Sequence, residues 1–527
     1  MKRRSFIKAA AASTVLPVSL NGMGLKSFQE SALLTALGKR SSNGKVLVLV
    51  QLNGGNDGLN TIIPLDQYSK LTKARSNVIM DETKVIKTWV DKVGLHPGLA
   101  ALNNKLFAAK KMSIVQSVGY PQPNFSHFRS TDIWMSASDS NTVVTTGWMG
   151  RYLDKQYSGF PTGYPNANMP DPLAIQIGPL VSLNFMGSNT NMGMAITDPS
   201  TFYNLVDNNA GSVPSTPAGD ELAYIRLLAQ QTNKYATVIK AAAAKGSNKS
   251  TLYPSGTRMN LGEQLKIVAK LISGGLKTPV YMVSLGGFDT HSAQVDSTDT
   301  TKGSHADLMT HLSQSIAAFQ DDLELLGVSD KVAGMTFSEF GRRVQSNASV
   351  GTDHGAAAPL MVFGDGVQPG VIGNNPSIPT TTTVNDNVPM QFDFRQVYAS
   401  VLKDWFELSS VEVKSILGAD FNTLPIFKNN SASIEDFADF MTQISISNVY
   451  PNPAVDHSIV QFRTDGGGKL KLRLFDPLGN LVQEYFDEDF SVGTHEYKLD
   501  LRGLKPGNYI LQLRSNVKSE TQVLQKL

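Results

Sequence analysis

The chain has 527 residues, 41% of them hydrophobic and 17% charged, so it is long enough for two or three domains with a sizeable core. Its formal net charge of +2 gives no electrostatic attraction to nucleic acid or an anionic membrane, and we expect no nucleic-acid partner. The sequence has no cysteine, which excludes disulfides, thiolate catalysis and cysteine-ligated metal sites. Any metal must therefore be held by histidine, carboxylate, amide or backbone oxygen.

The N-terminal segment, residues 1–30, has the pattern of an export signal. A basic start is followed by a short, alanine-rich apolar stretch, as in secretory signals. The pair Arg3 and Arg4, followed by Phe6 and Lys8, resembles the twin-arginine signal that carries folded proteins across the inner membrane. This resemblance implies the twin-arginine translocase as a partner and passage through the periplasm. An ordinary Sec signal that contains two arginines is the alternative.

Residues 40–427 alternate between strand and helix patterns, which predicts one α/β domain. Apolar runs predict strands over 45–52, 112–118, 173–178, 279–285, 332–337 and 359–363. Helical periodicity predicts helices over 220–244, 259–273, 303–326 and 394–408. Strands separated by helices favour a largely parallel sheet with helices on both faces. Ligands bind outside the carboxyl ends of the strands in such sheets, so the loops that follow strands are candidate sites.

The loop after the first predicted strand contains Asn53, Asn56 and Asp57 between glycines. Glycine lets the backbone turn tightly and approach a ligand closely. Asn53 and Asp57 are candidate metal ligands. We expect one of the polar residues to bind the metal and the others to form the turn.

A candidate nucleophile follows the strand predicted over 112–118, where a helix is expected to begin. A helix N-terminus stabilises an anion such as a developing alkoxide or a bound phosphate. Ser126 and His127 are therefore candidate catalytic residues, and Arg129 is a candidate anion contact. The alternative is that Ser126 only caps the helix.

The strand predicted over 279–285 leads into a glycine-rich loop that contains Asp289 and His291. Residues two apart in an extended segment point to the same side, so both side chains could reach one ion. The alternative is a capping Asp289 and a hydrogen-bonded His291 at a helix start.

Glu339 lies where the strand predicted over 332–337 would end, and it could bind a metal or accept a proton. The planar fork of Arg342 suits the binding of an anionic oxygen. A surface ion pair is the alternative for these two residues.

Asp353 and His354 lie side by side between Gly351 and Gly355, just before the last predicted strand. An extended strand would splay their side chains, whereas a bend between the glycines would turn both inward. Carboxylates with imidazoles favour zinc or manganese over calcium or magnesium. Asp353 could instead orient a histidine that binds the metal.

Residues 428–444 form a predicted linker, and the pattern becomes all-β over 445–527, which predicts a small β-sandwich. Three motifs in this tail, at Val449–Pro453, Leu474–Gly479 and Leu504–Tyr509, resemble the C-terminal sorting domain of type IX secretion substrates. That family is recognised by outer-membrane secretion machinery and is commonly removed on export. The resemblance implies this machinery as a partner and delivery to the cell surface or the medium. A carbohydrate-binding or adhesive sandwich is the alternative.

The central region resembles a large bacterial family, the domain of unknown function 1501. The motifs that carry the resemblance are Gln51–Asn60, Gly119–Pro121 with Ser126–Ser130, Gly147–Leu153, Gly286–His291, Glu339–Arg342 and Gly351–Gly355. They occur in the family's order and cover about residues 40–425. The chain is thereby identified as a member of this family.

That family in turn is distantly similar to the alkaline phosphatase and sulfatase superfamily, which implies an alkaline-phosphatase-like α/β fold. The superfamily's roles would fall on Asn53 or Asp57 as the early ligand, Ser126 as nucleophile, Asp289 with His291, and Asp353 with His354. Two-metal members use a further late histidine, and none occurs here between His354 and His457. The site is therefore expected to hold one metal, to use Glu339 as a replacement ligand, or to be inactive.

These resemblances imply an exported, metal-dependent hydrolase of phosphate or sulfate esters, with a small-molecule or glycan ester as substrate. A non-catalytic surface binding protein on the same fold is the alternative, because a fold alone does not determine function.

Overall fold

The structure, a computed structural model, describes residues 19–20, 23–24, 44–199, 217–255, 261–428, 444–464, 468–477, 479–491, 493–515 and 519–527. Its contacts divide the chain into two units, Met1–Asn43 and Gly44–Leu527. In the first unit, β1 (Ser19–Leu20) pairs antiparallel with β2 (Met23–Gly24). The rest of the predicted signal over 1–30 lies outside the described residues, as does nearly all of the predicted linker over 428–444.

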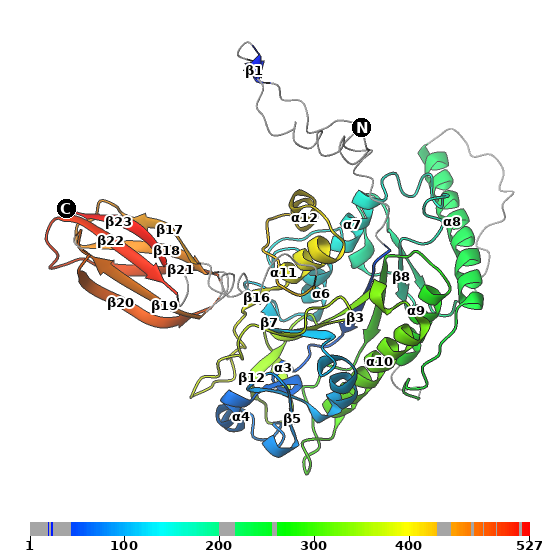
Figure 1. The fold of residues 1–527 in the computed structure, drawn as a ribbon, viewed down its shortest axis with the longest axis horizontal. Coiled ribbons are helices and arrows are strands. Elements are labelled where there is room, and N and C mark those ends of the chain that lie inside the picture. The colour runs from blue at the N-terminus through cyan, green and yellow to red at the C-terminus, as the bar shows by residue number, and fades with distance from the viewer. Residues whose placement is uncertain are drawn as a thin grey trace, which may run out of the picture. The chain divides into compact units, whose positions relative to one another are not determined.

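Within the described residues, one nine-stranded sheet organises the α/β domain (Figure 1). Its strands, in spatial order, are β15 (Gly370–Ile372), β7 (Met112–Gly119), β14 (Ala358–Phe363), β11 (Val332–Phe337), β3 (Val46–Leu52), β10 (Val280–Leu285), β8 (Ala174–Ile177) and β9 (Gly193–Ile196), with β16 (Phe392–Asp393) beside β7. All residues of β3, β7 and β11 are buried, as expected for strands covered on both faces.

Strand direction confirms the prediction of a largely parallel sheet. Strands β9, β8, β10, β3 and β11 pair in parallel, and β15 and β16 are parallel to β7. Strand β14 is antiparallel to both of its neighbours, β11 and β7. The start of β14 therefore lies at the edge of the sheet where the neighbouring strands end.

Helices cover both faces of the sheet. The helices of the described residues are α3 (Gly58–Thr61), α4 (Tyr68–Ala74), α5 (Ala100–Leu102), α6 (His127–Ser136), α7 (Trp148–Gln156), α8 (Pro217–Lys245), α9 (Leu261–Ser273), α10 (Ser304–Leu326), α11 (Phe394–Ser400) and α12 (Ser410–Leu417). Short helical turns are η1 (Leu65–Gln67), η2 (Glu82–Lys84), η3 (Pro97–Leu99), η4 (Asn103–Phe107), η5 (Leu183–Phe185), η6 (Ser329–Lys331) and η7 (Val401–Trp405). No helix in the described part of the chain is both long and apolar enough to cross a membrane.

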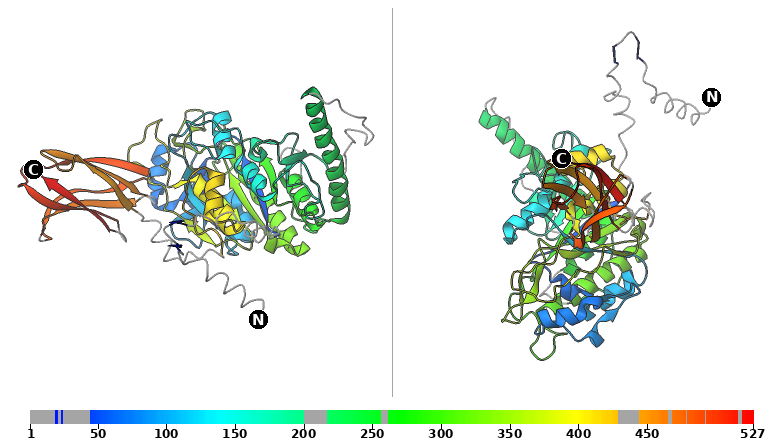
Figure 2. Two further views of the ribbon diagram at one scale, coloured as in Figure 1. Left: turned by 90° about the horizontal axis from the view of Figure 1, so that it is seen from above. Right: turned by 90° about the vertical axis from the view of Figure 1, so that its left-hand side faces the viewer.

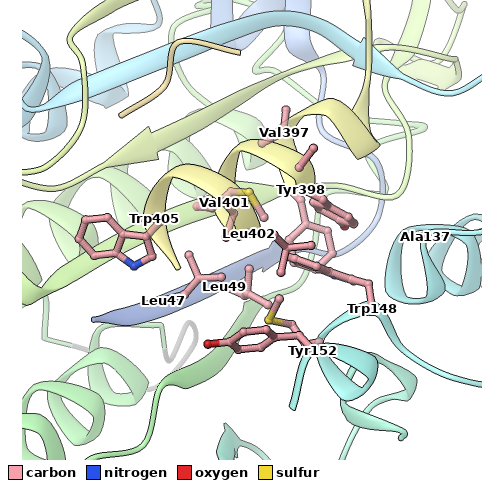
Figure 3. Close-up of a cluster of buried hydrophobic side chains, with 14 of the residues drawn as sticks. Leu47, Leu49, Ala137, Trp148, Tyr152, Val397, Tyr398, Val401, Leu402 and Trp405 are labelled. Carbon is pink, nitrogen blue, oxygen red and sulfur yellow. The ribbon is translucent and has the colours of Figure 1, made fainter. Parts of the chain in front are cut away.

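Two hydrophobic cores result from the alternation of side chains along β3. Leu47 and Leu49 pack in one core with residues of α6, α7, α11 and α12 (Figure 3). Val48 and Val50 pack in the other core with residues of α8, α9 and α10. The central strand is thus fixed from both sides, which holds the loop that follows it in place.

Two small sheets lie outside the large one. Strands β4 (Ile62–Pro64), β6 (Val93–Leu95) and β5 (Ile86–Lys87) form the first. Strands β12 (Arg342–Ser346) and β13 (Thr352–His354) form the second, with antiparallel pairing. The predicted bend between Gly351 and Gly355 is wrong, because residues 352–354 are extended in β13.

The C-terminal region has its own hydrophobic core between antiparallel sheets, and its strands are the orange to red arrows of Figure 2. One sheet contains β17 (Ile444–Tyr450), β18 (His457–Thr464) and β21 (Gly493–Asp500). The other contains β20 (Leu481–Phe490), β19 (Gly468–Phe475), β22 (Gly507–Arg514) and β23 (Ser519–Lys526). The prediction of a small all-β sandwich is confirmed.

Candidate metal centre

The candidate site lies at one edge of the large sheet, across five neighbouring strands. Strands β7, β11, β3 and β10 end at this edge, and the antiparallel strand β14 begins there. The predicted site residues of these connections are His127 after β7, Glu339 after β11, Asn53 after β3, Asp289 and His291 after β10, and Asp353 and His354 before β14. Segments far apart in the sequence thus meet because the sheet order makes their strands neighbours.

Three side chains form a cluster that could hold a metal ion. One ligand atom each from His127, Asp289 and His354 lies within 4.8 Å of the others. His291 adjoins the cluster, because its Nε2 atom is 3.2 Å from Asp289 Oδ1 and 2.9 Å from His354 Nε2. The side chain of Asp289 is 48% exposed, so the cluster is open to solvent. His127, which the sequence assigned to catalysis, therefore lies among the predicted metal ligands.

His127, His354 and the adjoining His291 are oriented in the same way, each with Nδ1 against a hydrogen-bond acceptor. The pairs are His127 Nδ1 to Glu339 Oε1 at 2.8 Å, His291 Nδ1 to Asp353 Oδ1 at 2.9 Å, and His354 Nδ1 to the Phe125 carbonyl at 2.8 Å. A neutral imidazole has one N–H group, so donation from Nδ1 places the lone pair of each ring on Nε2. Two of these Nε2 atoms lie 3.2 Å from Asp289 Oδ1, and that of His127 lies 3.4 Å from Asp289 Oδ2.

This set of donors fits a divalent cation. His127 Nε2 is buried without a hydrogen-bond partner in the described part of the chain. The Nε2 atoms of His291 and His354 are 2.9 Å apart, and two lone pairs at that distance repel unless they share a proton or a cation. Imidazole nitrogens with a carboxylate are ligands that zinc and manganese accept. The histidines that hydrogen-bond to Glu339 and Asp353 have the carboxylate–histidine arrangement common in metal sites.

Electrostatics favour charged carboxylates at Asp289 and Asp353 and a neutral imidazole at His354. Partial burial alone would raise the pKa of Asp289, but the hydrogen bond and the positive charge of Arg342 help to lower it to about 2. Burial alone would raise the pKa of Asp353, but the hydrogen bonds from Asn347 and His291 and the nearby positive charges together lower it. Burial lowers the pKa of His354 below its ordinary value. At neutral pH the two carboxylates are charged and this imidazole is neutral, as metal binding requires.

Arg342 does not have its predicted role as an anion clamp. It is 1% exposed, and Glu339 is 3% exposed, so the alternative of a surface ion pair is also wrong. Its guanidinium donates to five acceptors, namely the carbonyls of Gly54, Gly55, Thr352 and Phe288 and the carboxylate of Asp289. Arg342 therefore joins the loops after β3 and β10 to strand β13. Its hydrogen bond to Asp289 Oδ1 fixes the orientation of that carboxylate.

Arg129 is also directed away from the cluster. Its guanidinium donates to the carbonyls of Asp139, Ser140 and Thr142, in the segment that follows α6. These contacts fix that segment. The predicted contact between Arg129 and a substrate anion is therefore not supported by the geometry.

Ser126 lies beside the cluster at the N-cap position of α6. Its side chain is exposed and makes no capping hydrogen bond, so the alternative of side-chain capping is wrong. The residues on either side both reach the site, since the Phe125 carbonyl accepts from His354 and the His127 ring belongs to the cluster. Ser126 is thus held next to the candidate metal position by two neighbours.

Asp57 lies outside the cluster, contrary to its prediction as a ligand. It is 1% exposed, and both of its carboxylate oxygens accept from Arg75 Nη1 at 2.9 Å. Although burial would raise the pKa of Asp57, the Arg75 guanidinium holds it below the ordinary value. Asn53 contributes through its backbone, whose N–H donates to Leu285 and whose carbonyl accepts from Phe288. The loop after β3 therefore holds the loop after β10 in place through backbone hydrogen bonds, and its Asp57 provides no ligand to the cluster.

Two glycines allow the backbones of these loops to come into contact. A Cβ atom on Gly351 would lie 2.3 Å from the backbone carbonyl of His291. A Cβ atom on Gly54 would lie 2.3 Å from the backbone nitrogen of Asp289, and the φ of Gly54 is +120°. Larger residues at these positions would push apart the loops that carry the cluster.

Together, the fold and the cluster define an α/β protein with a histidine–carboxylate site at the carboxyl edge of its sheet. The chain belongs to the family described as "Protein of unknown function (DUF1501)", which matches residues 44–417. Residues 448–526 match the family described as "Secretion system C-terminal sorting domain". The sequence has no match among curated proteins.

Several solved structures are similar to this chain at low identity. The PsFucS1 sulfatase from Pseudoalteromonas sp. shares 10% identity, with a TM-score of 0.33 and coverage of 89% of this chain and 85% of that one. A protein in the alkaline phosphatase superfamily from Vibrio parahaemolyticus shares 10% identity, with a TM-score of 0.34 and coverage of 92% and 83%. PorZ, a surface component of the type IX secretion system of Porphyromonas gingivalis, shares 20% identity over 19% of this chain and 13% of its own, with a TM-score of 0.13.

Proposed function

We propose that the chain is an exported, metal-dependent hydrolase of phosphate or sulfate esters. The observation that carries this proposal is the orientation of three imidazole Nε2 lone pairs around the carboxylate of Asp289. A bound zinc or manganese ion would polarise the ester oxygen and stabilise an attacking oxygen. His127, Asp289, His291 and His354 would hold that ion.

The carboxylates around the histidines have a separate task in this proposal. Glu339 and Asp353 accept from Nδ1 of His127 and His291, which fixes the orientation of both rings and keeps Nε2 free to bind. Glu339 also accepts from the backbone N–H of Gly54 at 2.8 Å, so its own position is fixed by the loop after β3. Both carboxylates therefore orient ligands and do not join the ligand set.

The number of metal ions follows from the same geometry. The late histidine of two-metal superfamily members has no counterpart in the sequence between His354 and His457. His127 provides the third imidazole from the start of α6 instead. Asp57, which could have served a second ion, is engaged by Arg75. One ion per chain is the stoichiometry that this arrangement supports.

Ser126 is the proposed nucleophile. Its hydroxyl is exposed at the N-terminus of α6, where the helix dipole favours a developing alkoxide. Its oxygen would attack phosphorus or sulfur and displace the ester alcohol. The charge of the transferring group would be met by the ion and the backbone N–H groups of α6, because Arg129 and Arg342 are engaged by the fold.

Export is supported by the two ends of the chain. The tail that matches a sorting domain supports delivery to the cell surface or the medium by the type IX machinery. Arg3 and Arg4 support prior passage through the twin-arginine translocase. In this proposal residues 445–527 are the sorting domain and residues 40–427 are the hydrolase domain, which acts on a small-molecule or glycan ester.

The experiment that tests the activity is a screen of the zinc- and manganese-loaded protein with 4-nitrophenyl phosphate and 4-nitrophenyl sulfate. We expect turnover of one ester, and a loss of at least about 100-fold in Ser126→Ala with metal content unchanged. Ser410→Ala, a change at another exposed serine at a helix start, is the control. Metal binding without turnover of either ester would support a non-catalytic surface binding protein, which the engagement of Arg129 and Arg342 already favours as the alternative.

A further inference from the structure

The two segments that carry the cluster each have a threonine that faces into the protein. Thr290 lies between Asp289 and His291, and Thr352 precedes Asp353. Both threonines are buried, whereas the side chains of Asp289, His291 and Asp353 beside them are about half exposed. In the second segment this alternation follows from the extended backbone of β13, and in the first the N–H of Thr290 bonds back to the carbonyl of Phe288 in a tight turn. Each ligand segment therefore has a hidden polar group behind it.

One glutamine side chain contacts both threonines. Gln294 Oε1 accepts from Thr352 Oγ1 at 2.6 Å and from Thr290 Oγ1 at 3.1 Å. Its Nε2 donates to Asp57 Oδ2 at 2.6 Å. Gln294 is fully buried, and Asp57 is held in turn by Arg75. The amide thus joins the loops after β3 and β10 to strand β13.

Backbone contacts hold Gln294 and the threonines in register. The N–H of Gln294 donates to the carbonyl of Val350 at 2.8 Å, and the N–H of Thr352 donates to the carbonyl of Thr290 at 3.1 Å. The carbonyl of Gln294 accepts from the N–H of His305, near the start of α10, at 3.0 Å. These backbone hydrogen bonds fix the position of Gln294 relative to strand β13 and the start of α10.

We propose that Gln294 is a positioning residue that sets the spacing between the two ligand segments of the metal centre. Within the described residues its side chain hydrogen-bonds to Thr290, Thr352 and Asp57, and it acts through the two threonines, which lie next to the ligand residues in the chain. The inference rests on the proposed metal centre. It also gives a role to the buried Asp57, which lies in the loop after β3 and accepts the hydrogen bond from Gln294 Nε2.

The physical basis is the cost of an unsatisfied buried polar group. Removing the amide would leave the Asp57 carboxylate without one donor and both threonine hydroxyls without their shared acceptor. Each loss favours a rearrangement that lets these groups find other partners. Such a rearrangement would change the distance between the segments that carry Asp289 with His291 and Asp353 with His354.

The test replaces Gln294 by methionine, which keeps the length and approximate volume of the side chain and removes its hydrogen bonds. The matched control is Gln264→Met, because Gln264 is also buried and also uses its amide twice, but on Ser284 of strand β10. Zinc affinity would be measured by competition with a chelator of known affinity. We expect Gln294→Met to bind zinc about 10-fold more weakly than the wild type and Gln264→Met to bind within about twofold of it.

Hydrogen exchange of the metal-free proteins tests the positioning role of Gln294 independently of metal binding. We expect amide exchange in Gln294→Met to rise together over residues 286–294 and 349–356, and to remain as in the wild type over these residues in Gln264→Met. If the wild type binds zinc and Gln294→Met binds it with the same affinity, the positioning role is overturned and the proposed function remains intact. A wild type that binds no zinc would overturn the metal centre. In that case exchange that rises in both segments still supports the role of Gln294 as their spacer, and exchange that rises in neither overturns it.

Discussion

His127 Nδ1 lies 2.8 Å from Glu339 Oε1, although 212 residues separate the two in the sequence. The contact joins the start of α6 to the loop after β11, across the sheet order β7-β14-β11. It also places the His127 N–H on the side away from Asp289, so that Nε2 faces the cluster. The orientation of one proposed ligand is thus determined by a buried carboxylate that is itself fixed by Gly54.

We expect Glu339→Gln to weaken metal binding by about 10- to 100-fold, because a neutral amide is a poorer acceptor for the His127 N–H and does not fix the ring. The measurement is calorimetric titration of the metal-free protein with zinc. Glu263→Gln, on the exposed face of α9, is the control and should bind as the wild type does. Equal affinity in the wild type and Glu339→Gln would show that the carboxylate does not support the ligand.

Gly351→Ala should destabilise the α/β domain by about 1–3 kcal/mol, because the new methyl group would lie 2.3 Å from the His291 backbone and force two loops apart. Gly286→Ala is the matched control, since a Cβ atom there meets nothing within 4 Å. Urea unfolding would be followed by the fluorescence of the four tryptophans, all of which lie in this domain. Equal losses of stability in both variants would remove the steric explanation.

Stability should fall in acid because of a buried histidine pair, His96 and His305. Burial is the main cause that lowers the pKa of His96 to about 3 and that of His305 to about 4. Both folded-state values lie below the unfolded value of about 6.5, so the unfolded chain binds more protons as the pH falls. Stability from this pair is fully present above pH 6.5 and is lost as the pH falls toward 4, by about 1.4 kcal/mol per pH unit for each histidine.

The check is urea unfolding of the chelator-treated protein at several pH values between 7.5 and 4.5. We expect His305→Leu to flatten this dependence relative to the wild type, because one of the two groups that must take up a proton is gone. His96→Leu is a second variant that should act in the same direction. A pH dependence as steep in both variants as in the wild type would assign the acid sensitivity to other groups.

Removal of residues 445–527 should leave the α/β domain folded in the periplasm, because these residues carry the match to a sorting domain. Fractionation of cells that express the full-length and shortened chains is the measurement. Replacement of Arg3 and Arg4 by lysine should instead trap the precursor in the cytoplasm. Undiminished surface delivery of the shortened chain would contradict the sorting role of the tail.

The sheet could be predicted from the sequence because its strands are long apolar runs between glycine-rich loops. The predicted strand over 45–52 corresponds to β3, and the predicted strand over 279–285 corresponds to β10. Strand β9 was missed, because its four residues contain one glycine and lie in a segment rich in loop-forming residues. The reversed direction of β14 could not be predicted, since an apolar run carries no information about its direction in a sheet.

The site was partly predictable for a related reason. Asp289, His291 and His354 follow or precede strands in glycine-rich loops, and loops of that kind converge at one edge of a parallel sheet. The partners of the other candidates depend on tertiary contacts that no local pattern encodes. Asp57 has the chemistry of a ligand, but Arg75, outside every motif, neutralises it. Gln294, in a polar loop, gave no local signal of its role.

The metal centre can be tested by the metal content of the purified protein, together with its melting temperature with and without chelator. We expect about one zinc or manganese ion per wild-type chain and a lower melting temperature after chelation, because an ion that binds the folded state stabilises it. His127→Ala and His354→Ala should each lose the ion, melt low from the start and respond little to chelator. A wild-type chain that carries no transition metal, and whose melting is unchanged by chelator and by both substitutions, would contradict the metal centre and the hydrolase proposed from it.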